Sequence, residues 1–203
     1  MELHITRSKS RVLISRLFGL MIVLLILFTG HSFTQEGVLD VSFEVTGLLL
    51  LTVAAVGRLW ALLYISGHKK QKLVATGPYS MMRHPLYFFS LIGVVGIGLA
   101  SENLLVLALL LAFYALYYPF AIRMEEKKLI QKFGASYTEY MATVPAFLPK
   151  LSLYESPDHY EVNTGQFIRN FRDAIWFIWI FPLLHGIEAL QHWGIVPILW
   201  KVP

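Results

Sequence analysis

The sequence predicts an all-α integral membrane protein, a helical bundle of about five transmembrane helices with short interfacial helices on one side. Hydrophobic residues fill 56% of the 203 positions and charged residues only 15%, and a soluble domain of this length cannot cover so much apolar surface. The apolar residues also fall in blocks of about 20, the length that crosses a bilayer as a helix. Finally, fifteen of the 17 lysines and arginines lie on one side of the membrane if there are five spans.

The apolar blocks predict the spans in chain order. They cover residues 14–30, 39–66, 85–101, 103–122 and 171–199. The first is not read as a cleavable signal peptide, because its apolar run is long and no small-residue cleavage site follows it cleanly. The last contains Pro182 and Gly186, with Pro197 near its end, so it is expected to kink or to form two shorter helices.

The basic residues predict the orientation. They gather before the first span, between the second and third, and after the fourth, whereas the loops at 31–38 and 101–103 contain Glu36 and Glu102 but no cation. The positive-inside rule therefore places the amino terminus and the segments 67–87 and 123–149 in the cytosol. The net charge of +4 follows from this placement, and no basic, aromatic-rich surface predicts a nucleic-acid partner.

The segment 67–87 carries the first candidate site residues. Gly77-Pro78 predicts a turn and Pro85 suits the first turn of the third span. Tyr79, Arg83, His84 and Tyr87 therefore gather at a helix start, where free N–H groups favour an anionic ligand group. Arg83 and Tyr87 taken singly also fit a simple membrane-surface anchor.

The segment 123–149 contains an acidic pair, Glu125-Glu126, directly after the fourth span. At a cytosolic membrane edge such a pair needs a partner or a role. The simpler interpretation is pairing with neighbouring cations on a solvated helix face. Gly134 is expected to end this helix, and Tyr137 and Tyr140 are expected to pack rather than to catalyse.

Arg58 is also a candidate site residue. An arginine within a membrane span marks a functional site unless its side chain extends to the membrane–water interface. His185 and Glu188 are spaced to satisfy each other. Several chemistries have no motif here: the chain has no cysteine, no GxGxxG, Walker A or HExxH pattern, and its seven histidines are scattered. No metal site is predicted. Gly93, Gly96 and Gly98 are expected to permit close helix packing.

The order of several short motifs resembles the isoprenylcysteine carboxyl methyltransferase family and its phospholipid methyltransferase relatives. The matching residues are Gly57-Arg58-Leu59-Trp60, Leu73-Val74, Gly77-Pro78-Tyr79, Arg83-His84-Pro85-Leu86-Tyr87, Glu125-Glu126, Phe133-Gly134, Tyr137, Tyr140 and Val144-Pro145-Ala146-Phe147-Leu148-Pro149. The resemblance covers about residues 45–150 of a single domain, 1–203, to which a carboxy-terminal span at about 171–199 is added.

The resemblance implies a membrane enzyme that binds S-adenosylmethionine without a Rossmann domain. By position, the cofactor pocket would be lined by Gln71, Lys72, Leu73, Val74, Tyr79, His84, Pro85, Leu86, Tyr87, Glu125 and Glu126. Glu125 would pair with the cofactor ammonium or accept from its ribose, and His84 and Tyr87 would hold its carboxylate. Arg83, Arg123 and Arg58 are the candidates for positioning the acceptor.

The acceptor implied is a lipid or a small molecule with a carboxylate, a thiol or a phospholipid amine. Eukaryotic members carry an arginine for the substrate carboxylate where this chain has Ala121, and Arg123 is displaced from that position by two residues. Phe89 stands where many relatives have glycine, which is expected to narrow the entrance from the lipid. Both departures weigh against isoprenylcysteine as the acceptor.

Two other classes of protein fit part of the sequence. Membrane sterol reductases, which use NADPH, are similar in the carboxy-terminal FG…Y…Y…P pattern, although they usually differ at the Arg83–Tyr87 motif. A membrane scaffold that keeps the fold without catalysis is the non-enzymatic alternative. The short loops and the resemblance point to a bacterial plasma membrane, and the oligomeric state is not predicted.

Overall fold

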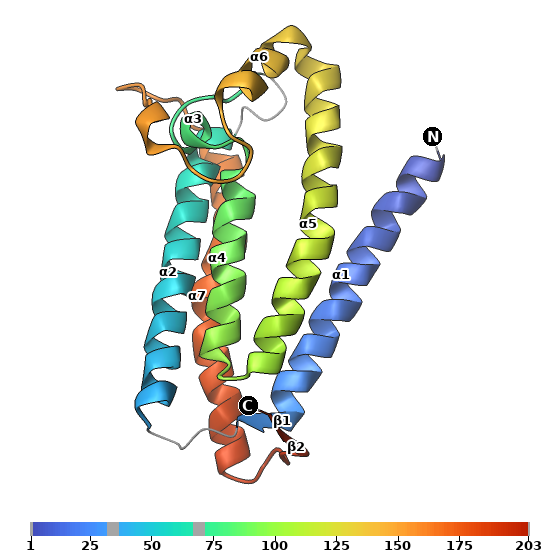
Figure 1. Ribbon diagram of the computed structural model, residues 1–203, viewed down its shortest axis with the longest axis vertical. Coiled ribbons are helices and arrows are strands. Elements are labelled where there is room, and N and C mark those ends of the chain that lie inside the picture. Colours follow the sequence, from blue (N-terminus) through green and yellow to red (C-terminus); the bar gives the residue numbers. More distant parts are fainter. Residues whose placement is uncertain (1, 32–36, 67–71, 203) are drawn as a thin grey trace.

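The computed structural model describes residues 2–31, 37–66 and 72–202, with the side chains of 2–12 and 31 excepted. Seven α-helices, one 3-10 turn and two short strands follow one another along the described chain (Figure 1). They are α1 (Glu2–Phe28), β1 (Thr29–His31), α2 (Val38–Ile65), α3 (Pro78–Met81), α4 (Pro85–Ala100), α5 (Leu104–Phe133), α6 (Ala135–Thr143), the 3-10 turn η1 (Leu151–Leu153), α7 (Thr164–His192) and β2 (Trp200–Val202).

The predicted fold class is confirmed. Helices α2, α5 and α7 are long and apolar enough to cross a membrane, and shorter apolar helices cover Leu13–Phe28 and Pro85–Ala100. Together these five correspond in order to the five predicted spans. Large apolar side chains remain exposed on their outer faces, such as Leu116, which is 81% exposed, because lipid rather than protein is the expected neighbour of such a surface.

The centre of the bundle is formed by α2, α4 and α7, with α5 beside α4 and α1 at the outer edge (Figure 1). Small residues let α2 and α4 approach closely. A Cβ on Gly47 would lie 2.6 Å from the backbone nitrogen of Ala100, and one on Gly96 would lie 2.9 Å from that of Leu51. The expectation that helix glycines serve close packing is therefore confirmed for Gly96.

The limit of the fourth span at 122 and the bounds of the last span differ from the prediction, whereas Gly134 ends the helix as expected. The fourth span continues to Phe133 and ends at Gly134, whose φ of 56° favours glycine, so the acidic pair lies on the spanning helix itself. The last span is one helix, Thr164–His192, rather than 171–199; of the two predicted alternatives the division into two helices is wrong, since Pro182 lies inside a continuous helix. A proline removes a single backbone donor, and the packing of α7 on α2 and α4 holds the remaining turns together.

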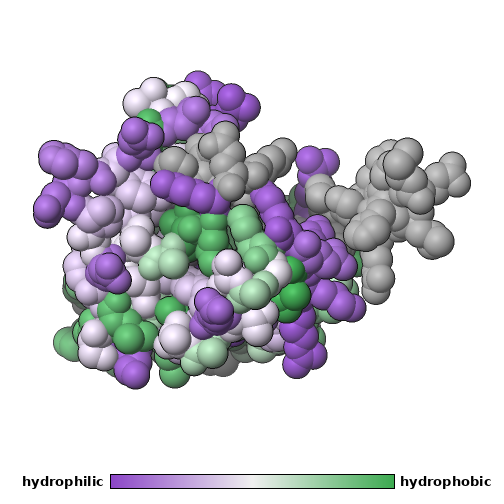
Figure 2. All heavy atoms as spheres, turned by 90° about the horizontal axis from the view of Figure 1, so that it is seen from above, coloured by the Kyte–Doolittle hydropathy of each residue, from purple (hydrophilic) through white to green (hydrophobic). Residues whose placement is uncertain are grey.

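The two ends of the bundle differ. Helices α3 and α6 and the loops that flank them gather at one end, which we call the site end, and the parallel pair β1–β2 lies at the other (Figure 1). Viewed from the site end, hydrophobic side chains are surrounded by hydrophilic ones (Figure 2). Leu148, Leu151 and Tyr154 are among the exposed side chains of the loop that follows α6. This end therefore presents apolar as well as polar groups.

Candidate functional site

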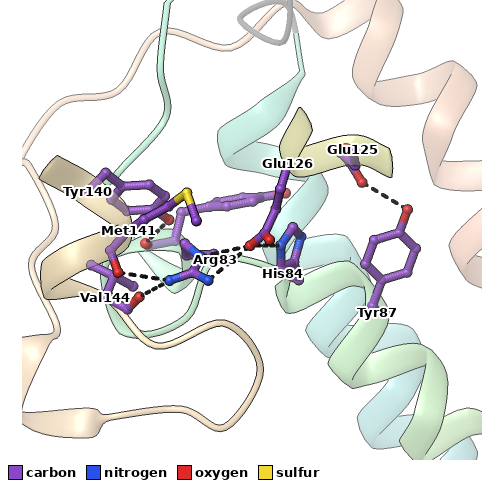
Figure 3. A network of polar contacts seen from close by, with 9 residues as sticks. Arg83, His84, Tyr87, Glu125, Glu126, Tyr140, Met141 and Val144 are labelled. Atoms are coloured by element: carbon purple, nitrogen blue, oxygen red, sulfur yellow. Dashed lines mark hydrogen bonds and ion pairs between the residues drawn. The ribbon is translucent and has the colours of Figure 1, made fainter. Parts of the chain in front are cut away.

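Arg83, His84 and Glu126 form a hydrogen-bonded cluster at the site end (Figure 3). Arg83 donates to Glu126 Oε1 from Nε at 3.0 Å and from Nη2 at 2.9 Å. His84 Nε2 lies 3.0 Å from the same oxygen. Arg83 and His84 precede α4, and Glu126 lies near the end of α5, so this cluster joins the start of one helix to the end of another.

Arg83 also holds the chain that follows α6. Its Nη1 donates to the carbonyls of Met141 at 3.0 Å and Val144 at 2.7 Å. The backbone nitrogens of Arg83 and His84 donate to the carbonyls of Pro145 and Ala146. A guanidinium has five N–H donors, and Arg83 uses four of them within the protein. These contacts give Arg83 a positioning role, and a substrate has little left to bind on it.

Glu125 makes a different contact from its neighbour. Tyr87 donates a hydrogen bond to Glu125 Oε2 at 2.8 Å (Figure 3). Tyr87 is held in turn, because Tyr114 donates to its carbonyl oxygen at 2.8 Å. Successive residues on a helix point about 100° apart, so Glu126 turns to the cluster while Glu125 faces a cavity.

Two adjacent cavities meet at the site end. The larger has a volume of about 300 Å³, at the lower end of the range for ligand pockets, and the smaller about 60 Å³. Both are lined by Ile65, Tyr79, Arg83, His84 and Glu125. The smaller extends between Leu73, Val74, Leu129 and Phe133, and the larger between Arg58, Pro85, Leu86, Tyr87, Ser90 and Tyr118. The smaller cavity therefore adds mainly apolar groups to the shared lining, and the larger adds a second arginine, Arg58.

Tyr79 lies between the two cavities with an unsatisfied hydroxyl. Its side chain is 6% exposed, and its buried Oη has no hydrogen-bond partner among the described residues. Burial and then the charge of Glu125 raise the pKa of Tyr79 well above its ordinary value, so the hydroxyl stays protonated. A buried donor without a partner costs stability, and this orphaned group fits a site that is completed by a ligand.

The tyrosines of α6 support this position. Tyr140 donates to the carbonyl of Tyr79 at 2.6 Å, and Tyr137 is 1% exposed beside it. Burial raises the pKa of Tyr137 to about 12. Both side chains line the smaller cavity, so the expectation that they pack is right, and the structure adds that they form part of a site wall.

Most of the predicted pocket residues are brought together. Lys72, Leu73 and Val74 line the smaller cavity; Pro85, Leu86, Tyr87 and Arg58 line the larger; Tyr79, His84, Arg83 and Glu125 line both. Glu126 braces the cluster instead. Arg123 is exposed on α5 and does not belong to either lining. Gln71 lies outside the described residues.

The structure adds lining residues that the sequence analysis missed, namely Leu129, Phe133, Tyr118, Ser90 and Ile65. Leu129 and Phe133 follow Glu125 at intervals of four residues, which places them on the same helix face. That spacing was the signal available in the sequence. The ring of Phe89 packs against Gly57 and lines neither cavity; that it narrows an entrance from the lipid stays a prediction.

Comparison with known protein families identifies the class to which the chain belongs. The family model described as phospholipid methyltransferase matches residues 44–136, the part of the chain that carries Arg58, Arg83, His84 and both glutamates. The chain belongs to this family of membrane proteins.

Its relatives include two bacterial resistance proteins. The chain is 40% identical over 182 residues to the nickel-cobalt-cadmium resistance protein NccN of Alcaligenes xylosoxydans xylosoxydans, covering 90% of the chain and 85% of the relative. It is 38% identical over 174 residues to the cobalt-zinc-cadmium resistance protein CzcN of Cupriavidus metallidurans, covering 86% and 80%. No solved structure matches the chain significantly.

Proposed function

We propose that the chain is an S-adenosylmethionine-dependent methyltransferase whose site opens at the cytosolic membrane surface and acts on a lipid-like or small acceptor. The observation that carries this proposal is the pair of adjacent cavities on which Glu125 and the unpartnered Tyr79 hydroxyl both lie. The orientation rests on the positive-inside rule, since Lys127, Lys128 and Lys132 are exposed on α5 at the site end.

The residues of the two cavities suit the chemistry of this cofactor. The carboxylate of Glu125 matches a cationic ammonium or the hydroxyls of a ribose. Val74, Leu129 and Phe133 supply apolar surface for a purine. Tyr79 supplies a protonated hydroxyl as a donor, and His84 lies at the shared wall beside it. The site therefore offers this cofactor one carboxylate, one hydroxyl donor with no partner among the described residues, and an apolar surface.

When bound, S-adenosylmethionine supplies an electrophilic methyl carbon that passes to a nucleophile while the electron pair of its bond stays on sulfur. The protein's contribution is alignment and exclusion of water. Arg83 and Glu126 fix the walls by joining α4, α5 and the chain after α6. Tyr87 orients the Glu125 carboxylate. Little proton transfer is required for a carboxylate acceptor, whereas an amine or thiol must lose a proton first.

Calorimetric titration of the detergent-purified protein with S-adenosylhomocysteine tests the proposal. We expect saturable binding that Glu125→Gln weakens strongly and that Glu139→Gln, a change at an exposed glutamate of α6, leaves intact. Absence of binding by folded wild-type protein would reject the cofactor. Thermal stabilisation by NADPH in the same preparation would favour the reductase alternative, and stabilisation by neither compound would favour the scaffold.

The names of the two relatives suggest a physiological setting. We propose that methyl transfer by this chain contributes to metal resistance of the kind those names state. In a strain made sensitive to cobalt or cadmium by deletion of such a relative, expression of the wild-type chain should restore growth and expression of Glu125→Gln should not. Equal rescue by both would separate resistance from the cofactor site.

A further inference from the structure

We propose that Arg58 binds an oxyanion of the methyl acceptor, a phosphate or carboxylate group, inside the larger cavity. Arg58 would thereby select acceptors that carry such a group near the atom to be methylated. The inference rests on the proposed function and deepens it, because it names the acceptor class and the residue that positions it.

The hydrogen bonds of Arg58 leave much of its guanidinium available. Nη1 donates to Ser90 Oγ at 2.6 Å and to the Leu86 carbonyl at 3.3 Å. Nε is buried and has no hydrogen-bond partner in the part of the chain that the structure describes. Of the five donors of a guanidinium, only those on Nη1 are therefore satisfied by hydrogen bonds within the described part of the chain.

The charge of Arg58 also lacks a close counter-charge. Both acceptors on Nη1 are neutral, and no carboxylate among the described residues forms an ion pair with it within 4.0 Å. The ring of Phe177 lies 5.5 Å from its guanidinium carbon, and Asp173 acts on it only as a charge at longer range. An arginine within a spanning helix, here about two turns from its end at Ile65, is costly unless something compensates its charge.

The other two arginine candidates lack this combination of features. Arg83 gives four donors to the protein and pairs with Glu126 at 2.9 Å. Arg123 is exposed on α5 and lines neither cavity. Of the three, Arg58 alone combines free donors, an uncompensated charge and a place in the wall of a cavity of about 300 Å³.

The lining of the same cavity also includes Glu125. A negative and a positive side chain thus face one space, and the planar fork of Arg58 matches an oxyanion through two parallel hydrogen bonds. If Glu125 serves the cofactor, an anion on Arg58 holds the acceptor within the same cavity. A phosphate or carboxylate meets this need, and a neutral or purely cationic acceptor does not.

Binding of simple anionic amphiphiles tests the assignment without requiring activity. Dodecyl phosphate and dodecanoate are titrated calorimetrically into the protein in an uncharged detergent, with inorganic phosphate to distinguish a lipid head group from a free ion. We expect at least one of the three to bind the wild type, and Arg58→Gln to weaken that binding by roughly tenfold or more. The matched control is Arg172→Gln, an exposed arginine of α7, and it should bind like the wild type.

A second variant keeps the test decisive if Arg58→Gln unfolds. Arg58→Lys retains the charge but loses the fork, so it should remain folded and bind less tightly than the wild type. S-adenosylhomocysteine titrated into the same samples reports the cofactor site separately, and its affinity should be unchanged. Equal anion binding by wild type and both Arg58 variants overturns the inference, as does a wild type that binds none of the three probes.

Discussion

Glu125 and Glu126 are adjacent on α5, yet their carboxylates serve two different sets of partners. Glu126 Oε1 accepts hydrogen bonds from Arg83 and lies 3.0 Å from His84 Nε2, whereas Glu125 Oε2 accepts from Tyr87 and lines both cavities. The side chain of Glu126 is 16% exposed. One glutamate therefore braces the site and the other lines its cavities, which makes their substitutions distinguishable.

Glu126→Gln should lower the free energy of unfolding by about 2–4 kcal/mol, because Arg83 loses its charged partner in a largely buried position. Thermal unfolding in detergent measures the effect. Glu125→Gln should change stability much less while abolishing binding of S-adenosylhomocysteine. The division of roles fails if the two variants lose stability equally and retain equal affinity for that compound.

Tyr79→Phe should leave the stability of the ligand-free protein unchanged or slightly raised, because it removes a buried hydroxyl that has no partner. The same change should weaken binding of S-adenosylhomocysteine by roughly tenfold, the value of one buried hydrogen bond to a ligand. Tyr140→Phe is the comparison. Its hydroxyl donates to the Tyr79 carbonyl at 2.6 Å, so its loss should destabilise the free protein by about 1 kcal/mol. A clear loss of stability in Tyr79→Phe would contradict this reading.

Gly77→Ala should destabilise the protein by about 2 kcal/mol or more. The φ of Gly77 is 61°, and an added Cβ would overlap the ring of Tyr64. Gly186→Ala in α7 is the matched control, because nothing lies within 4 Å of a Cβ there, and alanine in a helix should stabilise by a few tenths of a kcal/mol up to about 1. Thermal unfolding of the two variants side by side measures the contrast. A Gly77 variant as stable as the wild type would show that this turn is not constrained.

The stability of the protein should depend on pH through Glu102, which lies at the end of the bundle opposite the site. Its side chain is 5% exposed in the turn between α4 and α5. Burial, then a hydrogen bond with Asp40 and the charges of Asp40, Glu188 and Glu44, raise its pKa to about 8. The folded state thus holds a proton that the unfolded chain releases near pH 4.5, so this contribution to stability is complete below that pH and is lost as the pH rises through 8.

Melting temperatures of the wild type measured between pH 5 and pH 9 should therefore contain a downward component that Glu102→Gln removes. Glutamine keeps the shape of the protonated acid and cannot ionise. A Glu102→Gln profile that falls as steeply as that of the wild type would assign the dependence to other groups.

Much of the fold and part of the site follow from residues close together in the sequence. The apolar blocks determined which segments are helical and spanning, because the length and composition of one segment are enough to satisfy its backbone in lipid. Gly134 determined where α5 ends, since few other residues adopt its φ. The ordered motifs from Gly57 to Pro149 determined the family.

Tertiary structure decided which of those residues do what. Arg83 reaches Glu126 and the Val144 carbonyl, 43 and 61 residues away, and Arg58 reaches Ser90 at a separation of 32. Sequence spacing within one helix cannot reveal these partners, so it left three arginines equivalent as candidates. Where α2, α4, α5 and α6 pack at one end, Arg83 donates its hydrogen bonds to the protein, Arg123 is exposed and Arg58 lines a cavity. The groups that folding places beside a charged side chain decide whether that charge is available to a ligand.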